Sequence, residues 1–247
     1  MIFADIHNHS LAFVDDGAQS EEIMYRMVDA AYANGTRLLC LTPHFHPICF
    51  SDNREAALES FEKLQAYAAE HYPKLRLYLG NELRHGPNCD SWIREGFCRP
   101  LGNSSLILVD FPMDVDQRVV VRGLSQILSI GYRPVLAHAE RYPNLTRNAV
   151  RDFLRNGVQI QINSGSLTGS FGYGARWRAR QLMRYRLVSM VASDAHDLRH
   201  RSPRLSDGYY LTAKLTDKDY ADRVFYHNAV DLLENNREGL VKEDERK

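Results

Sequence analysis

The stretch "ADIHNHS", residues 4–10, follows a short apolar run and carries two histidines separated by one residue. Side chains alternate between the two faces of a β-strand, so His7 and His9 leave one face while Ile6 and Asn8 leave the other. Two imidazoles on one face can chelate a metal ion. They can equally be hydrogen-bonded surface groups. The rest of the chain decides between a metal site and a pair of surface histidines.

Apolar, β-branched runs like the one at 2–6 recur along the chain and alternate with segments of helical periodicity. The further predicted strands are 37–42, 75–80, 104–109, 133–138, 158–163 and 187–193. The predicted helices are 20–34, 53–70, 116–130, 145–156, 174–185 and 217–236. No linker interrupts the alternation, which favours a single domain over 1–247, with 238–247 as a solvated tail. Repeated βα units predict a parallel sheet covered by helices.

Most of the predicted strands end in a side chain that can bind a metal. These residues are His7, His9, His44, Glu82, Asp110, His138, Asp194 and His196. The carboxyl ends of the strands converge on one face of a closed barrel, whereas an open sheet would spread them apart. We therefore expect an α/β fold of the TIM-like barrel type, with the metal site at the C-terminal ends of the strands.

The candidate ligands offer nitrogen and oxygen donors without a thiolate. This donor set favours manganese, iron or zinc in a hydrolytic cluster over a structural zinc site. The ligands are too many for one ion, so two or three divalent ions are expected.

Composition excludes several other functions. The 31 basic residues balance the 31 acidic ones, so charge gives no reason to expect nucleic acid as a partner. No apolar run approaches the roughly 20 residues of a membrane span, so we expect no membrane insertion and a cytoplasmic location. The cysteines lack a C-x-x-C pair and an Arg six residues downstream, which predicts reduced thiols and argues against a cysteine phosphatase. They are Cys40, Cys49, Cys89 and Cys98.

A set of short motifs resembles the PHP (polymerase and histidinol phosphatase) superfamily, and more closely its bacterial capsule-regulating protein-tyrosine phosphatases. The motifs are H-x-H (7–9), "VDDG" (14–17), "TPH" (42–44), "GNE" (80–82), "AHAERY" (137–142), "SGSLTGSFG" (164–172) and "SDAH" (193–196), followed by Arg201 and Pro203. The resemblance extends over about residues 5–204.

The resemblance implies a distorted (β/α)7 barrel that holds three divalent ions. The first ion would be held by His7, His9, Glu82 and Asp194, the second by Glu82, Asp110 and His138, and the third by Asp16, His44 and His196. Asp110 stands where these phosphatases usually have Glu. The choice of Asp16 over Asp15 comes from the family alone. The family also places phosphate-binding arginines at Arg141 and Arg201, whose guanidinium groups suit phosphate oxygens.

The function implied is hydrolysis of phosphotyrosine by metal-activated hydroxide, on the tyrosine-rich tail of a bacterial kinase that controls capsular or exopolysaccharide synthesis. One alternative is a PHP phosphatase for a small molecule such as histidinol phosphate or a nucleotide. Another is a non-catalytic regulatory binding module. An amidohydrolase would normally have a His after the sixth strand, where this chain has Asn163. "VDDG" and "SGSLTGSFG" favour the tyrosine-phosphatase branch.

Other residues near these motifs do not match a functional pattern on their own. The glycine-containing segment 164–174 is predicted as a loop that borders the cleft, because it lacks the Gly-Lys-Ser/Thr of a P-loop. Substrate contact and ordinary surface or packing roles both stay open for His46, His85, Phe45, Phe50 and Tyr173.

Overall fold

The computed structural model describes residues 1–46 and 53–235. Its strands are β1 (Phe3–Asp5), β2 (Thr36–Leu41), β3 (His44–Phe45), β4 (Arg76–Leu79), β5 (Glu82–Arg84), β6 (Leu106–Asp110), β7 (Arg133–Leu136), β8 (Gln159–Asn163) and β9 (Met190–Ala192). Every strand expected from the sequence is present. The short strands β3 and β5 are additional, and each follows a longer strand after a break of two residues.

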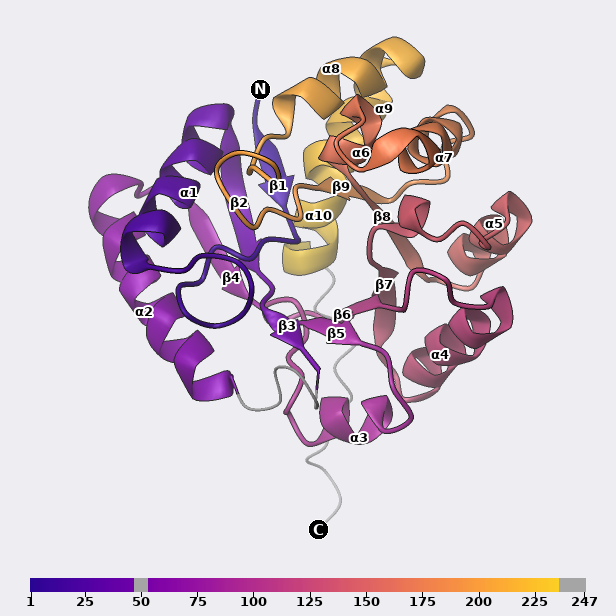
Figure 1. Cartoon of the computed structure of the whole chain (residues 1–247), viewed down its shortest axis with the longest axis horizontal. Coiled ribbons are helices and arrows are strands. Elements are labelled where there is room, and N and C mark those ends of the chain that lie inside the picture. Colours follow the sequence, from indigo (N-terminus) through magenta and orange to yellow (C-terminus); the bar gives the residue numbers. More distant parts are fainter. Residues whose placement is uncertain (47–52, 236–247) are drawn as a thin grey trace.

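All strand pairs are parallel. One sheet has the order β1-β2-β4 and the other the order β3-β5-β6-β7-β8-β9. Beyond the end of β1, the His9 N–H donates to the carbonyl of Ala195, just after β9, at 2.9 Å. The result is a curled parallel sheet, and the helices surround it in Figure 1. This architecture is consistent with a distorted TIM-like barrel.

Several helices begin where the sequence supplies a capping side chain. The helices are α1 (Glu21–Asn34), α2 (Arg54–His71), α3 (Cys89–Arg94), α4 (Gln117–Ser129), α5 (Arg147–Arg155), α6 (Ser164–Thr168), α7 (Gly172–Arg184), α8 (Ser206–Leu215), α9 (Lys218–Asp222) and α10 (Asn228–Val230). The Ser20 hydroxyl accepts from the Ile23 N–H at the start of α1, and Gly35 ends that helix with φ 110°. None of the helices in the described ranges is long and apolar enough to span a bilayer.

Apolar residues pack on both sides of the strands. Inside the curled sheet, alternate strand residues such as Leu38, Leu106 and Val135 are buried with Leu232 and Leu233 from the C-terminal helical segment. The residues between them on each strand pack outward against the helices. This alternation fixes which strand residues face the interior and which face the helices.

The helical prediction was wrong for one segment and incomplete for others. Segment 164–174 is not a loop, because helix α6 and the first turn of α7 occupy most of it. Helices α3 and α8 were not predicted, whereas the last predicted helical region begins close to the expected residue 217, with α9 at Lys218. From α9 to Asn235 the chain continues as short α- and π-helical turns. The predicted tail at 238–247 lies outside the described residues.

Candidate metal centre

The structure brings all the predicted metal ligands to the C-terminal ends of the strands. Their nitrogen and oxygen atoms form three groups, and within each group the ligand atoms lie within 4.8 Å of one another. The groups are His7, His9 and Asp194; Glu82, Asp110 and His138; and His9, Asp16, His44 and His196. Residues far apart in the sequence therefore share one site.

Glu82 lies at the centre of the cluster. One of its carboxylate oxygens, Oε2, is 3.2 Å from His7 Nε2 and 2.9 Å from His44 Nδ1. The other, Oε1, is 2.9 Å from His138 Nε2. The two imidazoles of the H-x-H pair also meet, with 3.1 Å between His7 Nε2 and His9 Nε2. A carboxylate in this position can bridge two cations.

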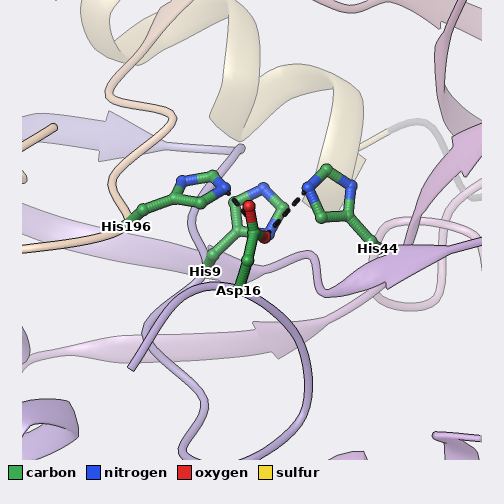
Figure 2. A group of neighbouring side chains, drawn as sticks. All are labelled: His9, Asp16, His44 and His196. Atoms are coloured by element: carbon green, nitrogen blue, oxygen red, sulfur yellow. Dashed lines mark ion pairs between the residues drawn. The ribbon is translucent and has the colours of Figure 1, made fainter. Parts of the chain in front are cut away.

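The third group forms the outer part of the centre. Asp16 Oδ1 is 3.3 Å from His44 Nε2 and 3.4 Å from His196 Nε2 (Figure 2). Figure 2 shows the carboxylate between the two imidazoles, with the His9 ring beside it. Of the two aspartates in "VDDG", Asp16 is the one that faces the cluster.

Asp15 supports the cluster from behind. Its Oδ2 accepts from His9 Nδ1 at 2.7 Å and from the His44 backbone N–H at 2.9 Å. A carboxylate on the Nδ1 side of an imidazole leaves Nε2 for a cation and fixes the ring's orientation. Gly17 lets this loop approach, because a Cβ at that position would lie 1.9 Å from the His9 carbonyl oxygen.

Strand β8 contributes a buried amide network that sequence reasoning missed. The Gln161 side-chain oxygen accepts from the His138 backbone N–H at 2.7 Å and lies 3.2 Å from His7 Nδ1. Its amide nitrogen donates to Asn163, whose own amide nitrogen donates to Asp194 at 2.7 Å. The signal in the sequence was the alternation of polar residues in "VQIQIN", which repeats the spacing of the H-x-H pair.

Two residues of the site have left-handed backbone conformations. His138 has φ 35° and Asp194 has φ 54°, values that residues other than glycine seldom adopt. The Asp194 N–H donates to the His7 carbonyl at 2.9 Å, which ties the two ligands together. Such strain persists only where the surroundings hold it, and it is concentrated at functional sites.

The electrostatics show a centre that suits cations. Burial, followed by the neighbouring Glu82 carboxylate, raises the pKa of Asp110 to about 8. Burial alone would lower the pKa of His7, but the carboxylates of Glu82 and Asp194 outweigh it and raise that pKa to about 9. Burial and the nearby His9 lower the pKa of His196 to about 4, so its ring is neutral near pH 7 and has a free lone pair.

Asp110 tests whether the residues fit a metal. Its Oδ2 lies 3.2 Å from Arg84 Nη1, whereas Oδ1 is buried and has no hydrogen-bond partner within the described ranges. A buried carboxylate oxygen without a partner costs free energy, and a cation would remove this cost. The oxygen and imidazole donors match the preferences of manganese, iron and zinc.

Two arginines lie beside the cluster. Arg201 Nη2 is 2.6 Å from Asp194 Oδ1, and Arg141 Nη1 is 3.8 Å from Asp194 Oδ2. Both guanidinium groups face the ring of Phe171, with their carbons 5.9 Å and 5.1 Å from its centroid. The fork of donors needed for a phosphate group is therefore present at the edge of the site.

The remaining residues singled out in the sequence are not among the proposed metal ligands. Phe45 is buried in the core and Tyr173 is 83% exposed. The ring of His85 stacks on Phe111, with 4.8 Å between the centroids, so its role is packing. His46 is partly buried near Arg84. Phe50 and Cys49 lie outside the described residues.

The described cysteines do not form a thiolate nucleophile. Cys40, Cys89 and Cys98 are buried and unpaired, and burial raises the pKa of each thiol. A buried thiol with a raised pKa is chemically inert.

The chain is similar in sequence to known tyrosine-protein phosphatases. The chain is 31% identical over 231 residues to tyrosine-protein phosphatase CpsB of Streptococcus pneumoniae, covering 91% of this chain and 95% of the relative. It is 28% identical over 236 residues to tyrosine-protein phosphatase YwqE of Bacillus subtilis strain 168, covering 94% and 91%.

A crystal structure from work on YwqE and CpsB, described as unique metal-dependent tyrosine phosphatases, matches with a TM-score of 0.85 at 28% identity, and 95% of each chain is covered. Histidinol phosphate phosphatase of Lactococcus lactis shares the fold, with a TM-score of 0.56 at 17% identity. The resemblance to capsule-regulating tyrosine phosphatases inferred from the motifs is confirmed.

A family model described as capsular polysaccharide synthesis, CpsB/CapC, matches residues 3–234. The chain therefore belongs to the CpsB/CapC family of capsular polysaccharide synthesis.

Proposed function

We propose that this protein is a metal-dependent protein-tyrosine phosphatase that hydrolyses phosphotyrosine on the tail of a bacterial tyrosine kinase controlling capsular or exopolysaccharide synthesis. The observation that carries the proposal is the convergence of histidines and carboxylates around Glu82, with Arg141 and Arg201 at its edge. The relatives named CpsB and YwqE are tyrosine-protein phosphatases. The free, buried cysteines suit a cytoplasmic enzyme.

We assign the ligands as three sites within a single domain of the (β/α)7 type. The first site is His7, His9, Glu82 and Asp194, the second Glu82, Asp110 and His138, and the third Asp16, His44 and His196. His9 is near enough to contribute to the third site as well. Two or three ions would be bound, with manganese as the first choice and iron or zinc as alternatives.

The protein's own groups define how phosphate would be held. When bound, the ions would lower the pKa of a water molecule and neutralise charge on the phosphate oxygens. Arg141 and Arg201 would donate to the remaining oxygens from the side of Phe171. Asp15 and Gln161 would keep the imidazoles of His9 and His7 turned toward the centre.

The test is hydrolysis of a phosphotyrosyl peptide by purified protein in the presence of Mn²⁺, with histidinol phosphate as the competing substrate. We expect turnover of the peptide to exceed that of histidinol phosphate, to stop in excess chelator and to return with Mn²⁺. Thiol alkylation of the metal-loaded protein should change the rate little. Full activity of metal-stripped protein in chelator would refute the proposal, and preference for histidinol phosphate would favour the small-molecule phosphatase.

A further inference from the structure

A second polar recess lies next to the metal centre. It has a volume of about 150 Å³ and is enclosed by the loop after β9, by α6 and by the start of α8. Helices α6 and α8 lie side by side in Figure 1. Arg201 and Phe171, which border the metal centre, also line this recess. The recess and the metal centre therefore share a wall.

The charged residues that line the recess are mainly basic. Arg199, Arg201 and Arg204 contribute guanidinium groups, and Asp207 is the one acidic residue in the lining. Arg204 Nη2 is 3.7 Å from Asp207 Oδ2, a long contact between two exposed side chains. The Arg199 guanidinium has no ion pair or hydrogen bond with any residue that the structure describes. The positive charge in this recess therefore exceeds the negative charge.

The loop that carries these arginines is held in place. The Asp197 carboxylate accepts the backbone N–H groups of Arg199 at 2.5 Å and His200 at 2.6 Å. The Arg201 carbonyl accepts from the backbone N–H of His196, one of the proposed metal ligands, at 2.9 Å. Arg199 thus lies on the same short segment as the proposed ligand His196. Hydrogen bonds fix the backbone of this segment before any ligand binds.

Neutral hydrogen-bond donors complete the lining. The hydroxyl-bearing residues are Ser164, Thr168, Ser170, Ser193 and Ser202. A hydroxyl can donate to an anionic oxygen, and a guanidinium can donate two parallel hydrogen bonds to a carboxylate or a phosphate. One water occupies about 30 Å³ of liquid, so the volume of the recess accommodates either group.

We propose that this recess is an anion subsite for a residue close to the phosphotyrosine in the substrate chain. The inference rests on the proposed phosphatase function and deepens it, because it predicts which phosphotyrosyl sequences are preferred. The ligand chemistry is a side-chain anion with planar or tetrahedral oxygens. Its two sources are an Asp or Glu carboxylate and the phosphate of a second phosphotyrosine.

The experiment compares phosphotyrosyl peptides that differ at one neighbouring residue. Asp, Asn or a second phosphotyrosine is placed in turn at each of the two positions on either side of the scissile phosphotyrosine. The metal-loaded wild type, Arg199→Ala, Arg204→Ala and the double variant are assayed for kcat/KM on each peptide. Arg118→Ala is the matched control, because Arg118 lies on α4, outside the recess, with its side chain 84% exposed.

At one or more positions, we expect the wild type and Arg118→Ala to prefer the Asp peptide over the Asn peptide by about tenfold, which corresponds to about 1.4 kcal/mol. The preference should fall below about threefold in the Arg199→Ala/Arg204→Ala double variant. A larger gain from the second phosphotyrosine than from Asp would identify phosphate as the preferred anion. Arg199 and Arg204 are exposed, so these substitutions remove no buried packing.

Two results would overturn the subsite. One is equal turnover of Asp, Asn and doubly phosphorylated peptides by the wild type, and the other is a preference that survives in the double variant. Both results still require turnover of phosphotyrosine, so they leave the proposed function standing. Absence of turnover of every peptide and of p-nitrophenyl phosphate would instead refute the phosphatase function and the subsite with it.

Discussion

Arg141 and Arg201 contact the same carboxylate in different ways. Arg201 donates to Asp194 at 2.6 Å, whereas Arg141 is 3.8 Å from the other oxygen of that group. Replacing Arg201 would remove a partner from a proposed metal ligand as well as a phosphate donor. Arg141 is the residue at which phosphate binding can be separated from metal binding.

Arg141→Ala should therefore retain bound metal and lose catalytic efficiency. Truncating one partner of a buried, charged hydrogen bond costs about 2–4 kcal/mol, which corresponds to a loss of about 30- to 1000-fold in kcat/KM. His138→Ala should lower both metal content and activity. Metal content by elemental analysis and kcat/KM on a phosphotyrosyl peptide distinguish the two. Near wild-type efficiency of Arg141→Ala would place the phosphate pocket elsewhere.

Among the side chains of the metal centre, the charged residues were predicted from the sequence and the neutral ones were missed. His7 or Glu82 can be recognised because imidazole and carboxylate at a strand end have few other uses when they recur along the chain. Gln161 and Asn163 are amides without charge, and their roles depend on which atoms they meet after folding. Asp15 and Asp16 are adjacent and chemically identical. Only the path of the loop decides that Asp16 faces the cluster and that Asp15 hydrogen-bonds to the back of the His9 ring.

Strand β8 acts as a positioning element. Its residues Ile160 and Ile162 pack outward in the core, so Gln159, Gln161 and Asn163 share the inner face. Gln161 is buried and bonds to groups of His7 and His138, whereas the amide nitrogen of Gln159 donates to the Gly157 carbonyl, near the start of the strand. The same residue type thus has two roles on one strand.

Gln161→Leu should weaken metal binding, and Gln159→Leu is its matched control. Loss of a group that orients a metal ligand typically costs 10- to 100-fold in affinity. We expect a loss of that order for Gln161→Leu in competition with a chelator, and a change below about threefold for Gln159→Leu. Saturating Mn²⁺ should restore a large part of the lost activity. Equal affinities in the two variants would show that β8 does not orient the ligands.

The elements themselves were predictable where periodicity was strong. The breaks at Thr42–Pro43 and at Gly80–Asn81, which separate β2 from β3 and β4 from β5, were not expected, since the apolar pattern simply ends there. Segment 164–174 looked like a loop because it is rich in glycine and serine. Tertiary contacts overcome that local preference: the Ser166 hydroxyl in α6 donates to the buried Glu140 carboxylate at 2.5 Å, and Leu167 is buried in the core.

For the whole molecule, the charge balance of the cluster couples metal binding, folding and pH. In the metal-free protein, burial opposes protonation of His7 and His44, but neighbouring carboxylates outweigh it and raise their pKa values to about 9 and about 11. Metal binding requires neutral imidazoles and ionised carboxylates, so ions must displace protons near pH 7. Affinity for Mn²⁺ should increase from pH 6.5 to pH 8.5.

The sign of the stability effect follows from the same shifts. A histidine whose pKa is raised from 6.5 to about 9, as for His7, stabilises the metal-free fold below pH 6.5 and loses that contribution as pH rises toward 9. Asp110, with its pKa raised to about 8, acts in the same direction, because between pH 4 and 8 the folded state holds more protons than the unfolded state. The lowered pKa values of Asp16 and Asp194 affect stability only in more acidic solution.

We therefore expect the Tm of chelator-treated protein to fall between pH 6.5 and pH 8.5, while the gain in Tm on adding Mn²⁺ increases. Free metal at 100 times its Kd stabilises by about 2.7 kcal/mol, which corresponds to roughly 5–10 °C for a chain of this size. Thermal unfolding at three pH values, with and without Mn²⁺, measures both trends, and calorimetry in two buffers of different ionisation enthalpy counts the protons released. A gain in Tm that shrinks with rising pH, or binding without proton release, would contradict the assignment of this cluster as a metal centre.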